Sequence, residues 1–333
     1  MTDKGAHTTS NSGQDNWMDV VSKYNFPDTK KSIWQLVNSI VPYFGILILM
    51  YYSLEISYWI TIALVIPATG FMTRIFIIFH DCGHRAFFKS PRANAITGFF
   101  TGLFTLTGYL KWQRSHNKHH STVGNLDQRG IGDVKTMTLD EYNAASKGQQ
   151  RSYRMYRHPL MLLGIGAPYL FILQNRLFSK HSDNKEKLNI LMTSLVLAFI
   201  ITGVSLLISF KTFIIIYLPI LHVSAVLGTW LFYMQHQFED VHWYREDEWD
   251  YPTVALNGSS FYKLPRVLQW FSGNIGFHHV HHLSPRIPNY KLEECHRDND
   301  LFNDIKPISL IESLKSFKLR LWDEKNGKLV GFR

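Results

Sequence analysis

Histidines gather in three short clusters with a repeated internal spacing. The stretch from Gly276 to Leu283 holds four histidines in five positions, and the other clusters run from His80 to His84 and from His116 to His120. Residues three and four apart share one face of a helix, so each cluster would project imidazoles to one side. The side chains with this spacing are His80, His84, His116, His119, His120, His278, His281 and His282.

Imidazoles in this number point to metal chemistry. Neutral imidazole binds zinc, copper, nickel or iron, and a structural zinc site takes four ligands. The eight cluster histidines, with His236 at the end of an apolar segment, are too many for one ion, so we predict two metal ions. Asn274, four residues before His278, is expected on the same helical face. His279 lies about 160° around a helix from His281 and is expected to support the site.

The metal pair is better suited to redox chemistry than to hydrolysis, because no carboxylate motif accompanies the histidines. The sequence carries no glycine-rich dinucleotide fingerprint, no haem-attachment motif and only two cysteines, Cys82 and Cys295. Electrons would therefore come from a partner. The net charge of +9 fits an acidic redox protein, and basic flanks of membrane spans explain the same charge.

Four apolar segments must position these clusters. They cover about 34–54, 58–79, 188–209 and 212–234, and each is long enough to cross about 30 Å of hydrocarbon. Very short links join the first pair and the second pair, which predicts two hairpins. Buried helices of a soluble protein would be interrupted by charges more often. We therefore expect an all-α integral membrane protein with four transmembrane helices.

Lysine and arginine are distributed unevenly along the chain. They concentrate in 80–187 and after 235. The four spans and the two short links inside the hairpins hold only Arg74 and Lys211. The positive-inside rule then places both termini and the loop between the hairpins in the cytoplasm. All three histidine clusters would lie on that side, where a helical cap would carry the dimetal site.

The chain divides into three parts on this interpretation. Residues 1–33 form a polar segment, disordered at its start with a short helix at the membrane surface. Residues 34–322 form one domain, with cytoplasmic parts 80–187 and 235–322, and residues 323–333 form a tail.

Several shorter segments are expected to build the cap. Residues 93–109 and 160–173 are apolar but too short to span a membrane, so we predict a re-entrant or interfacial segment for the first and an interfacial segment for the second. Thr138 to Glu141 is a capping box that would open a helix running to about Arg157. Apolar and basic residues alternate over 308–322, which predicts an amphipathic surface helix.

These features resemble the membrane fatty acid desaturases, a family with three histidine boxes of the forms HxxxH, HxxHH and HxxHH. The resemblance covers about 34–292 and includes the order, spacing and sidedness of the boxes. Residues 233–240, 258–265 and 274–288 are most similar to bacterial acyl-lipid desaturases, which act on acyl chains esterified in membrane lipids. The first box is shorter than the HxxxxH box of desaturases that use coenzyme A esters.

The resemblance implies two iron ions, O2 as co-substrate, and oxidation of a CH2–CH2 unit to a cis double bond. Two electrons would come from a ferredoxin or a similar small acidic donor. By position, the eight cluster histidines would bind iron, with His236 as a ninth ligand and Asn274 as a water-mediated contact. Asp81, His279 and Asp240 are candidates to orient the ligands. A bacterial cytoplasmic membrane is the expected location, no nucleic-acid partner is expected, and the oligomeric state is open.

Two other functions remain open at this point. Related histidine-box enzymes hydroxylate lipids, and the metal ligands alone do not separate hydroxylation from desaturation. The glutamates that accompany the histidines of alkane hydroxylases are absent, which favours desaturation. The other alternative is a metal-binding membrane receptor or transporter, which predicts ionisable residues inside the spans and a metal site of only three or four ligands.

Overall fold

Four long helices form the base of the molecule, and their ends carry part of the histidine clusters. The computed structural model describes residues 16–130 and 132–332 and is mostly helical. The long helices are α2 (Thr29–Ser53), α3 (Tyr58–Gly83), α9 (Asn184–Ile208) and α10 (Phe210–His236). Each is long and apolar enough to cross a membrane, and the four predicted spans overlap them.

Polar side chains set where each long helix begins. The carboxylate of Asp28 accepts hydrogen bonds from backbone N–H groups in the first turn of α2, and Asp183 does the same for α9. The hydroxyls of Ser57 and Ser209 cap α3 and α10. These caps satisfy backbone N–H donors that a helix start leaves unpaired. The cap at Ser57 allows α3 to begin only a few residues after α2 ends.

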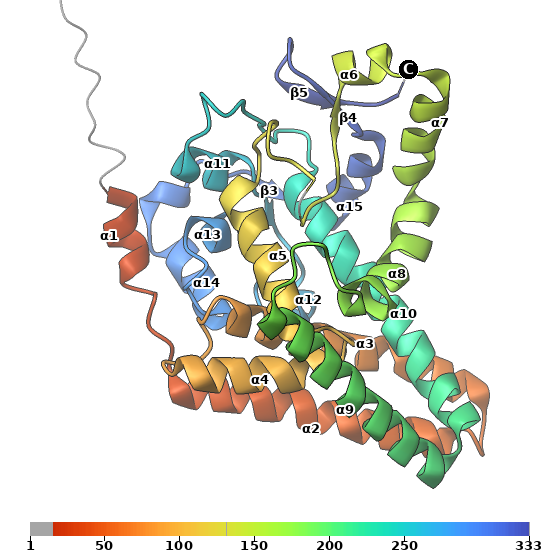
Figure 1. Ribbon diagram of the computed structural model, residues 1–333. Helices are drawn as coiled ribbons and strands as arrows, with labels where there is room; N and C mark the ends of the chain where they lie inside the picture. The colour runs from red at the N-terminus through yellow and green to blue at the C-terminus, as the bar shows by residue number, and fades with distance from the viewer. Residues whose placement is uncertain (1–15, 131, 333) are drawn as a thin grey trace, which may run out of the picture.

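The long helices pack so that two ligand-bearing ends meet. Helix α3 contacts both α2 and α10, and α10 also contacts α9 (Figure 1). Their shared core includes Met72 and Ile75 of α3 and Ile220 of α10, all fully buried. Because α3 leads to His80 and α10 ends at His236, this packing brings the two histidines to the same end of the bundle.

Most of the shorter elements form a cap above this base, whereas α4 (Pro91–Leu103) lies at the level of the long helices and packs on α3 (Figure 1). Before the base the chain forms α1 (Asn16–Ser22). Between α3 and α9 lie α4 (Pro91–Leu103), α5 (Tyr109–Thr122), α6 (Leu139–Ala144), α7 (Lys147–Tyr156), η1 (Leu160–Gly166), α8 (Ala167–Ile172) and η2 (Gln174–Arg176). After α10 lie α11 (Tyr251–Asn257), α12 (Arg266–Phe271), α13 (His278–Leu283), α14 (Asn289–Arg297), η3 (Asp300–Phe302), α15 (Leu310–Ser313) and η4 (Leu314–Lys318).

The cap also contains short strands, which the all-α prediction missed. The strands are β1 (Met137–Thr138), β2 (Phe261–Tyr262), β3 (Pro307–Ile308), β4 (Leu321–Asp323) and β5 (Lys328–Val330). β1 pairs in parallel with β4, which pairs antiparallel with β5, and β2 pairs in parallel with β3. These pairings tie the C-terminal segment to the rest of the cap.

Two of the predicted cap segments differ in form from the expectation. The capping box of Thr138 and Glu141 is present, but α6 ends when Ala145 becomes extended, and a second capping box at Ser146 opens α7. Residues 308–322 form short helical turns and then strand β4 in place of one amphipathic helix. Pairing with β5 extends the backbone there, because a tertiary partner outweighs the local helical pattern.

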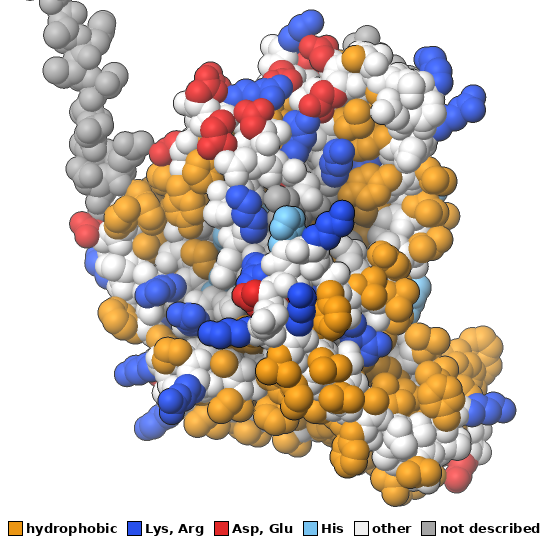
Figure 2. Space-filling model, viewed as in Figure 1, with side chains coloured by type: hydrophobic (Ala, Val, Ile, Leu, Met, Phe, Trp, Pro, Cys, Tyr) orange, Lys and Arg blue, Asp and Glu red, His pale blue; other side chains and the backbone are white. Residues whose placement is uncertain are grey.

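Side-chain types separate along the molecule. Apolar side chains gather over the base, lysines and arginines lie above them, and acidic side chains concentrate at the far end of the cap (Figure 2). Large apolar residues such as Phe199, Leu206 and Leu207 of α9 are mostly exposed. An exposed apolar surface of this kind suits contact with lipid.

Candidate metal centre

Three helices, one long and two shorter, carry the histidine clusters to one place. His80 lies in the last turn of α3, and His84 caps its C-terminus. Helix α5 carries the second cluster, and α13 carries the third. His236 ends α10. The nine histidines with ligand spacing, including His236, form two separate groups, one of five and one of four.

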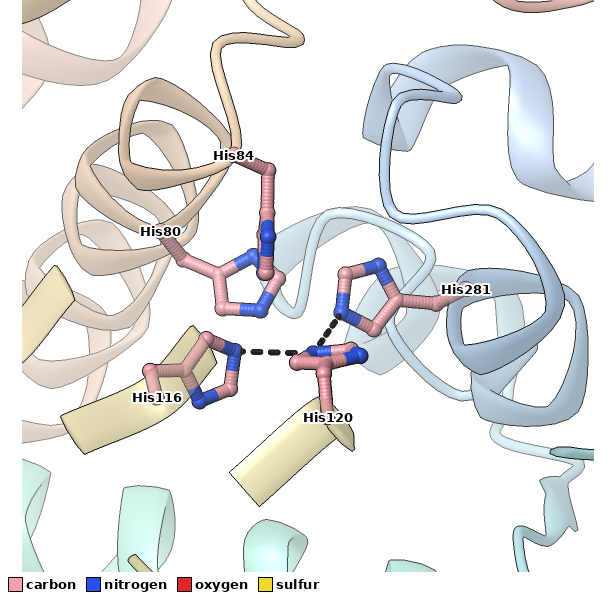
Figure 3. A group of neighbouring side chains, drawn as sticks. All are labelled: His80, His84, His116, His120 and His281. Carbon is pink, nitrogen blue, oxygen red and sulfur yellow. Dashed lines mark hydrogen bonds between the residues drawn. The ribbon is translucent and has the colours of Figure 1, made fainter. Parts of the chain in front are cut away.

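The first group has five members: His80, His84, His116, His120 and His281. One ligand nitrogen from each lies within 4.8 Å of those of the others. The Nε2 atom of His120 lies 3.1 Å from Nε2 of His116 and 3.1 Å from Nε2 of His281. All five rings point toward a common centre (Figure 3).

The second group has four members: His119, His236, His278 and His282. All four are buried, and their ligand nitrogens also lie within 4.8 Å of one another. The Nε2 atom of His236 lies 3.1 Å from Nε2 of His119 and 3.0 Å from Nε2 of His278. His236 thus joins residues of α5 and α13 around a second centre.

Each HxxHH cluster is shared between the two groups. In α5, the pair four residues apart enters the first group, and His119 crosses to the second. In α13 the pattern is reversed, because His278 and His282 enter the second group and His281 crosses to the first. The middle histidine of an HxxHH box lies about 60° around the helix from the first and about 100° from the last, which are only about 40° apart, so one helix can serve two centres.

The nitrogen atoms are placed as metal ligands would be. Metal–nitrogen bonds of about 2.1 Å put neighbouring ligand atoms about 3 Å apart, as these Nε2 atoms are. The Nε2 atoms of His84 and His282 are buried and have no hydrogen-bond partner. A buried nitrogen without a partner is costly, and a shared cation would satisfy all of them. The two groups therefore fit a pair of metal ions.

Burial keeps these imidazoles in the form that binds metal. Desolvation, followed by the neighbouring imidazoles, holds the pKa of His116, His120, His278 and His282 well below the usual value. A neutral imidazole has the free lone pair that a metal requires. None of the nine members of the two groups is a carboxylate, so the ligand atoms themselves would carry no charge.

Two ring orientations are fixed by other groups. The Nδ1 atom of His80 lies 3.2 Å from a carboxylate oxygen of Asp81. The Nδ1 atom of His236 lies 3.0 Å from the carbonyl oxygen of Gly258. A hydrogen bond at Nδ1 fixes the tautomer and leaves Nε2 for the metal.

His279 is placed away from both groups. It is fully buried, with its Nε2 atom 2.9 Å from Nδ1 of His296 and its Nδ1 atom 3.4 Å from the carbonyl oxygen of Ser260. The sequence pattern had not connected His296 to the third cluster, since the two lie on different helices. This pair supports α13 from the side opposite the metal groups.

Two predicted supporting residues do not contact the nine histidines. Helix α13 begins at His278, and Asn274 precedes it in a left-handed turn with φ 59°, so the expected shared helical face is wrong. The Asn274 side chain donates to the carbonyl oxygen of Asn289 instead. Asp240 is exposed, lies 3.8 Å from Lys306, and lines an open cavity of about 470 Å³ in the cap.

Aromatic side chains that the sequence pattern did not single out pack on the ligands. Trp112 stacks on His116 with ring centroids 4.3 Å apart. Phe232 lies 5.1 Å from the ring of His119 and 5.5 Å from that of His236. Both aromatic residues precede a histidine by four positions, so helical spacing is the signal that could have found them.

The fold and the site together define a protein with two histidine groups that could each hold a metal ion and four helices suited to a membrane. Comparison with known proteins agrees, since the family model described as fatty acid desaturase matches residues 57–304. The chain belongs to the fatty acid desaturase family, whose members are oxidoreductases.

Individual relatives extend this result. The chain is 47% identical over 313 residues to a fatty acid desaturase of Bacillus subtilis (strain 168), covering 94% of this chain and 89% of the relative. It is 27% identical over 269 residues to an sn-1 oleoyl-lipid 12-desaturase of Synechocystis, covering 77% and 71%. It is 29% identical over 244 residues to a chloroplastic sn-2 acyl-lipid omega-3 desaturase (ferredoxin) of Arabidopsis thaliana, covering 66% and 52%.

Proposed function

We propose that this protein is an acyl-lipid desaturase that introduces a cis double bond into an acyl chain of a membrane lipid. In the overall reaction, O2, two electrons and two protons take two hydrogen atoms from a CH2–CH2 unit and leave two waters. The observation that carries the proposal is the division of the histidines into groups of five and four in a chain of the desaturase family. The names of the cyanobacterial and plant relatives support the acyl-lipid substrate.

We infer two iron ions as the metals. His80, His84, His116, His120 and His281 would hold one ion, and His119, His236, His278 and His282 would hold the other. When bound, the iron pair supplies the oxidising chemistry that removes hydrogen from an unactivated carbon. The protein's own part is to keep the imidazoles neutral, to exclude water through burial, and to fix the position of the acyl chain.

A small apolar cavity of about 20 Å³ lies below the histidines, and an acyl chain would have to widen it to enter. It lies between α3, α8 and α10 and is lined by residues that include Met72, Phe76, Phe171, Leu221 and Gly228. Phe76 precedes His80 by about 6 Å along its helix, and Gly228 precedes His236 by about 12 Å. We propose that part of the substrate chain occupies this space, so that its depth selects which carbons meet the metals.

We also propose an arrangement with two hairpins, in which both termini, the cap and the metal centre face the cytoplasm. The uneven distribution of lysine and arginine supports this sidedness. The donor would be a ferredoxin or a similar small acidic protein. The net charge of +9 supports an acidic partner, and the name of one plant relative includes ferredoxin.

The test is product analysis with a defined electron supply. Iron-loaded protein in vesicles of saturated and monounsaturated lipids, supplied with ferredoxin, a reductase and NADPH, is expected to add a double bond to an acyl chain. Gas chromatography with mass spectrometry of the fatty acid esters would show the new double bond. Hydroxylated esters would show a hydroxylase instead, and an unchanged lipid profile from folded, iron-loaded protein would refute both.

A further inference from the structure

The carboxylate of Asp81 is held from two sides. One oxygen, Oδ1, lies 3.2 Å from Nδ1 of His80. The other, Oδ2, accepts hydrogen bonds from Asn289, from its backbone N–H at 2.7 Å and from its side-chain amide at 2.8 Å. Asp81 is 2% exposed, and no lysine or arginine pairs with it within the described residues. A buried carboxylate needs such donors, and Asn289 provides two of them.

Asn289 is itself fixed by its surroundings. It is 1% exposed and is the first residue of α14, where a backbone N–H has no partner inside the helix. Its side-chain oxygen accepts a hydrogen bond of 3.0 Å from the amide of Gln35 in α2. An ionised carboxylate only accepts hydrogen bonds, so the NH2 group of Asn289 must face Asp81 and its oxygen must face Gln35. This contact chain joins α2, α3 and α14 at one ligand.

The two metal groups differ in this respect. His80 of the first group has a carboxylate at Nδ1, whereas His236 of the second group has the neutral carbonyl oxygen of Gly258. A carboxylate raises the basicity of its imidazole and holds the ring more strongly than a carbonyl does. The donors that hold the carboxylate of Asp81 in place therefore influence the first group. The contact of Gly258 with His236 does not involve them.

We propose that Asn289 is a positioning residue for the first metal group. By donating twice to Asp81, it orients the carboxylate that sets the tautomer and ring angle of His80. The inference rests on the proposed dimetal site, but it does not depend on which lipid is oxidised. Asn289, the first residue of α14, thereby acquires a functional role although it lies outside all three histidine clusters in the sequence.

The test substitutes Asn289→Ala in the iron-loaded holoenzyme. The variant loses one donor to Asp81 and leaves the amide of Gln35 without its acceptor. We expect the turnover rate to fall about 10- to 100-fold. Mössbauer spectra should change at one of the two irons only, and the iron content should fall from two toward one per chain. N289S, whose hydroxyl can donate to Asp81, should restore part of the turnover and of the spectrum.

A matched control separates positioning from folding. Asn94 is also fully buried, and its amide makes three hydrogen bonds within 88–94 without a contact to any of the nine histidines. N94A should lower stability and leave both iron signals unchanged. An N289A protein with unchanged iron content and spectra, or with equal changes at both irons, would overturn the proposal. This test measures iron, so it does not depend on the desaturase proposal. That proposal would fail in a different measurement, if wild-type protein held two irons and formed no product.

Discussion

His282 is the histidine of the two groups with the least support from other parts of the chain. Both of its ring nitrogens are buried without a hydrogen-bond partner, and its ring stacks on His120 with centroids 4.1 Å apart. We predict that H282A removes one iron per chain and abolishes desaturation, because no other donor in the second group can replace it. Iron analysis and product analysis of the purified variant would measure this.

The neighbouring His279 provides the control for that prediction. Its two nitrogens contact His296 and Ser260, so H279A should keep both irons and lose about 1–3 kcal/mol of stability. If H279A lost iron and H282A retained it, the assignment of metal ligands within α13 would be reversed.

Gly228 offers a residue-scale test of the acyl-chain cavity. A Cβ atom added at this position would have no heavy atom within 4 Å, and the residue lines the cavity between α3, α8 and α10. We predict that G228L fills this space and moves the product toward shorter chains or a shifted double bond, with unchanged iron content. Mass spectrometry of the esters after derivatisation of the double bond would locate it.

Gly203 is the matched control for that substitution. A Cβ atom added there would also meet no heavy atom within 4 Å, but the residue lies in α9 and does not line the cavity. G203L should leave the product unchanged. Identical products from G228L and wild-type protein would mean that the acyl chain does not occupy this cavity.

Sequence spacing singled out eight of the nine histidines that the structure brings together, because i, i+3 and i+4 positions share a helical face whatever the tertiary fold, and the end of an apolar segment singled out His236. Their division into two groups could not be predicted, since it depends on how α3, α5, α10 and α13 meet. Asn274 was misplaced because the spacing argument assumed a continuous helix from Asn274 to His278, whereas Asn274 takes a left-handed conformation and α13 begins only at His278. Asn289 gave no signal, because it acts through contacts distant in sequence.

At the scale of elements, Arg157 joins the parts of the cap around the end of α10. Its guanidinium is 2% exposed and donates to six neutral acceptors. Two of them, the hydroxyl of Tyr233 and the amide oxygen of Gln237, flank His236 in the sequence. Another is the carbonyl oxygen of Leu319, which precedes β4. One side chain thus holds α7, α10 and the C-terminal segment together.

We predict that R157M lowers the stability of the protein by at least about 3 kcal/mol, because several buried acceptors lose their donor at once. Thermal unfolding in detergent micelles would show a lower midpoint. R151M, a substitution of an exposed arginine in α7, the helix that Arg157 follows, should change stability by no more than about 0.5 kcal/mol. Equal midpoints for the two variants would contradict the role of Arg157.

Elements were predicted where their signals are local. The four apolar segments and the capping box at Thr138 appear as expected, since composition and capping act within a few residues. The strands were missed because each has two or three residues and is stabilised by a distant partner, as when β1 pairs with β4. Helix α12 was also missed, since its six residues carry no cap and no long apolar run.

At the scale of the whole molecule, α12 indicates how far the cap reaches toward the membrane. Its residue Phe271 packs on Phe71 with ring centroids 5.1 Å apart, and Gly70 leaves room for this contact. The guanidinium of Arg74 stacks over the Trp270 ring at 3.9 Å. These α3 residues precede His80 by about 9–15 Å along the helix, so α12 lies at the depth of the proposed span.

The outer face of α12 is apolar, as a helix in the lipid headgroup region requires. Val267 is 67% exposed, Leu268 43% and Trp270 39%. We predict that a spin label at Val267, introduced by V267C in protein reconstituted into vesicles, is more accessible to O2 than to a water-soluble nickel chelate. A label introduced by K325C, at the exposed turn between β4 and β5, should show the opposite preference. Power-saturation electron paramagnetic resonance measures both accessibilities, and a label at position 267 that favours the nickel chelate would place α12 in water and the cap above the membrane surface.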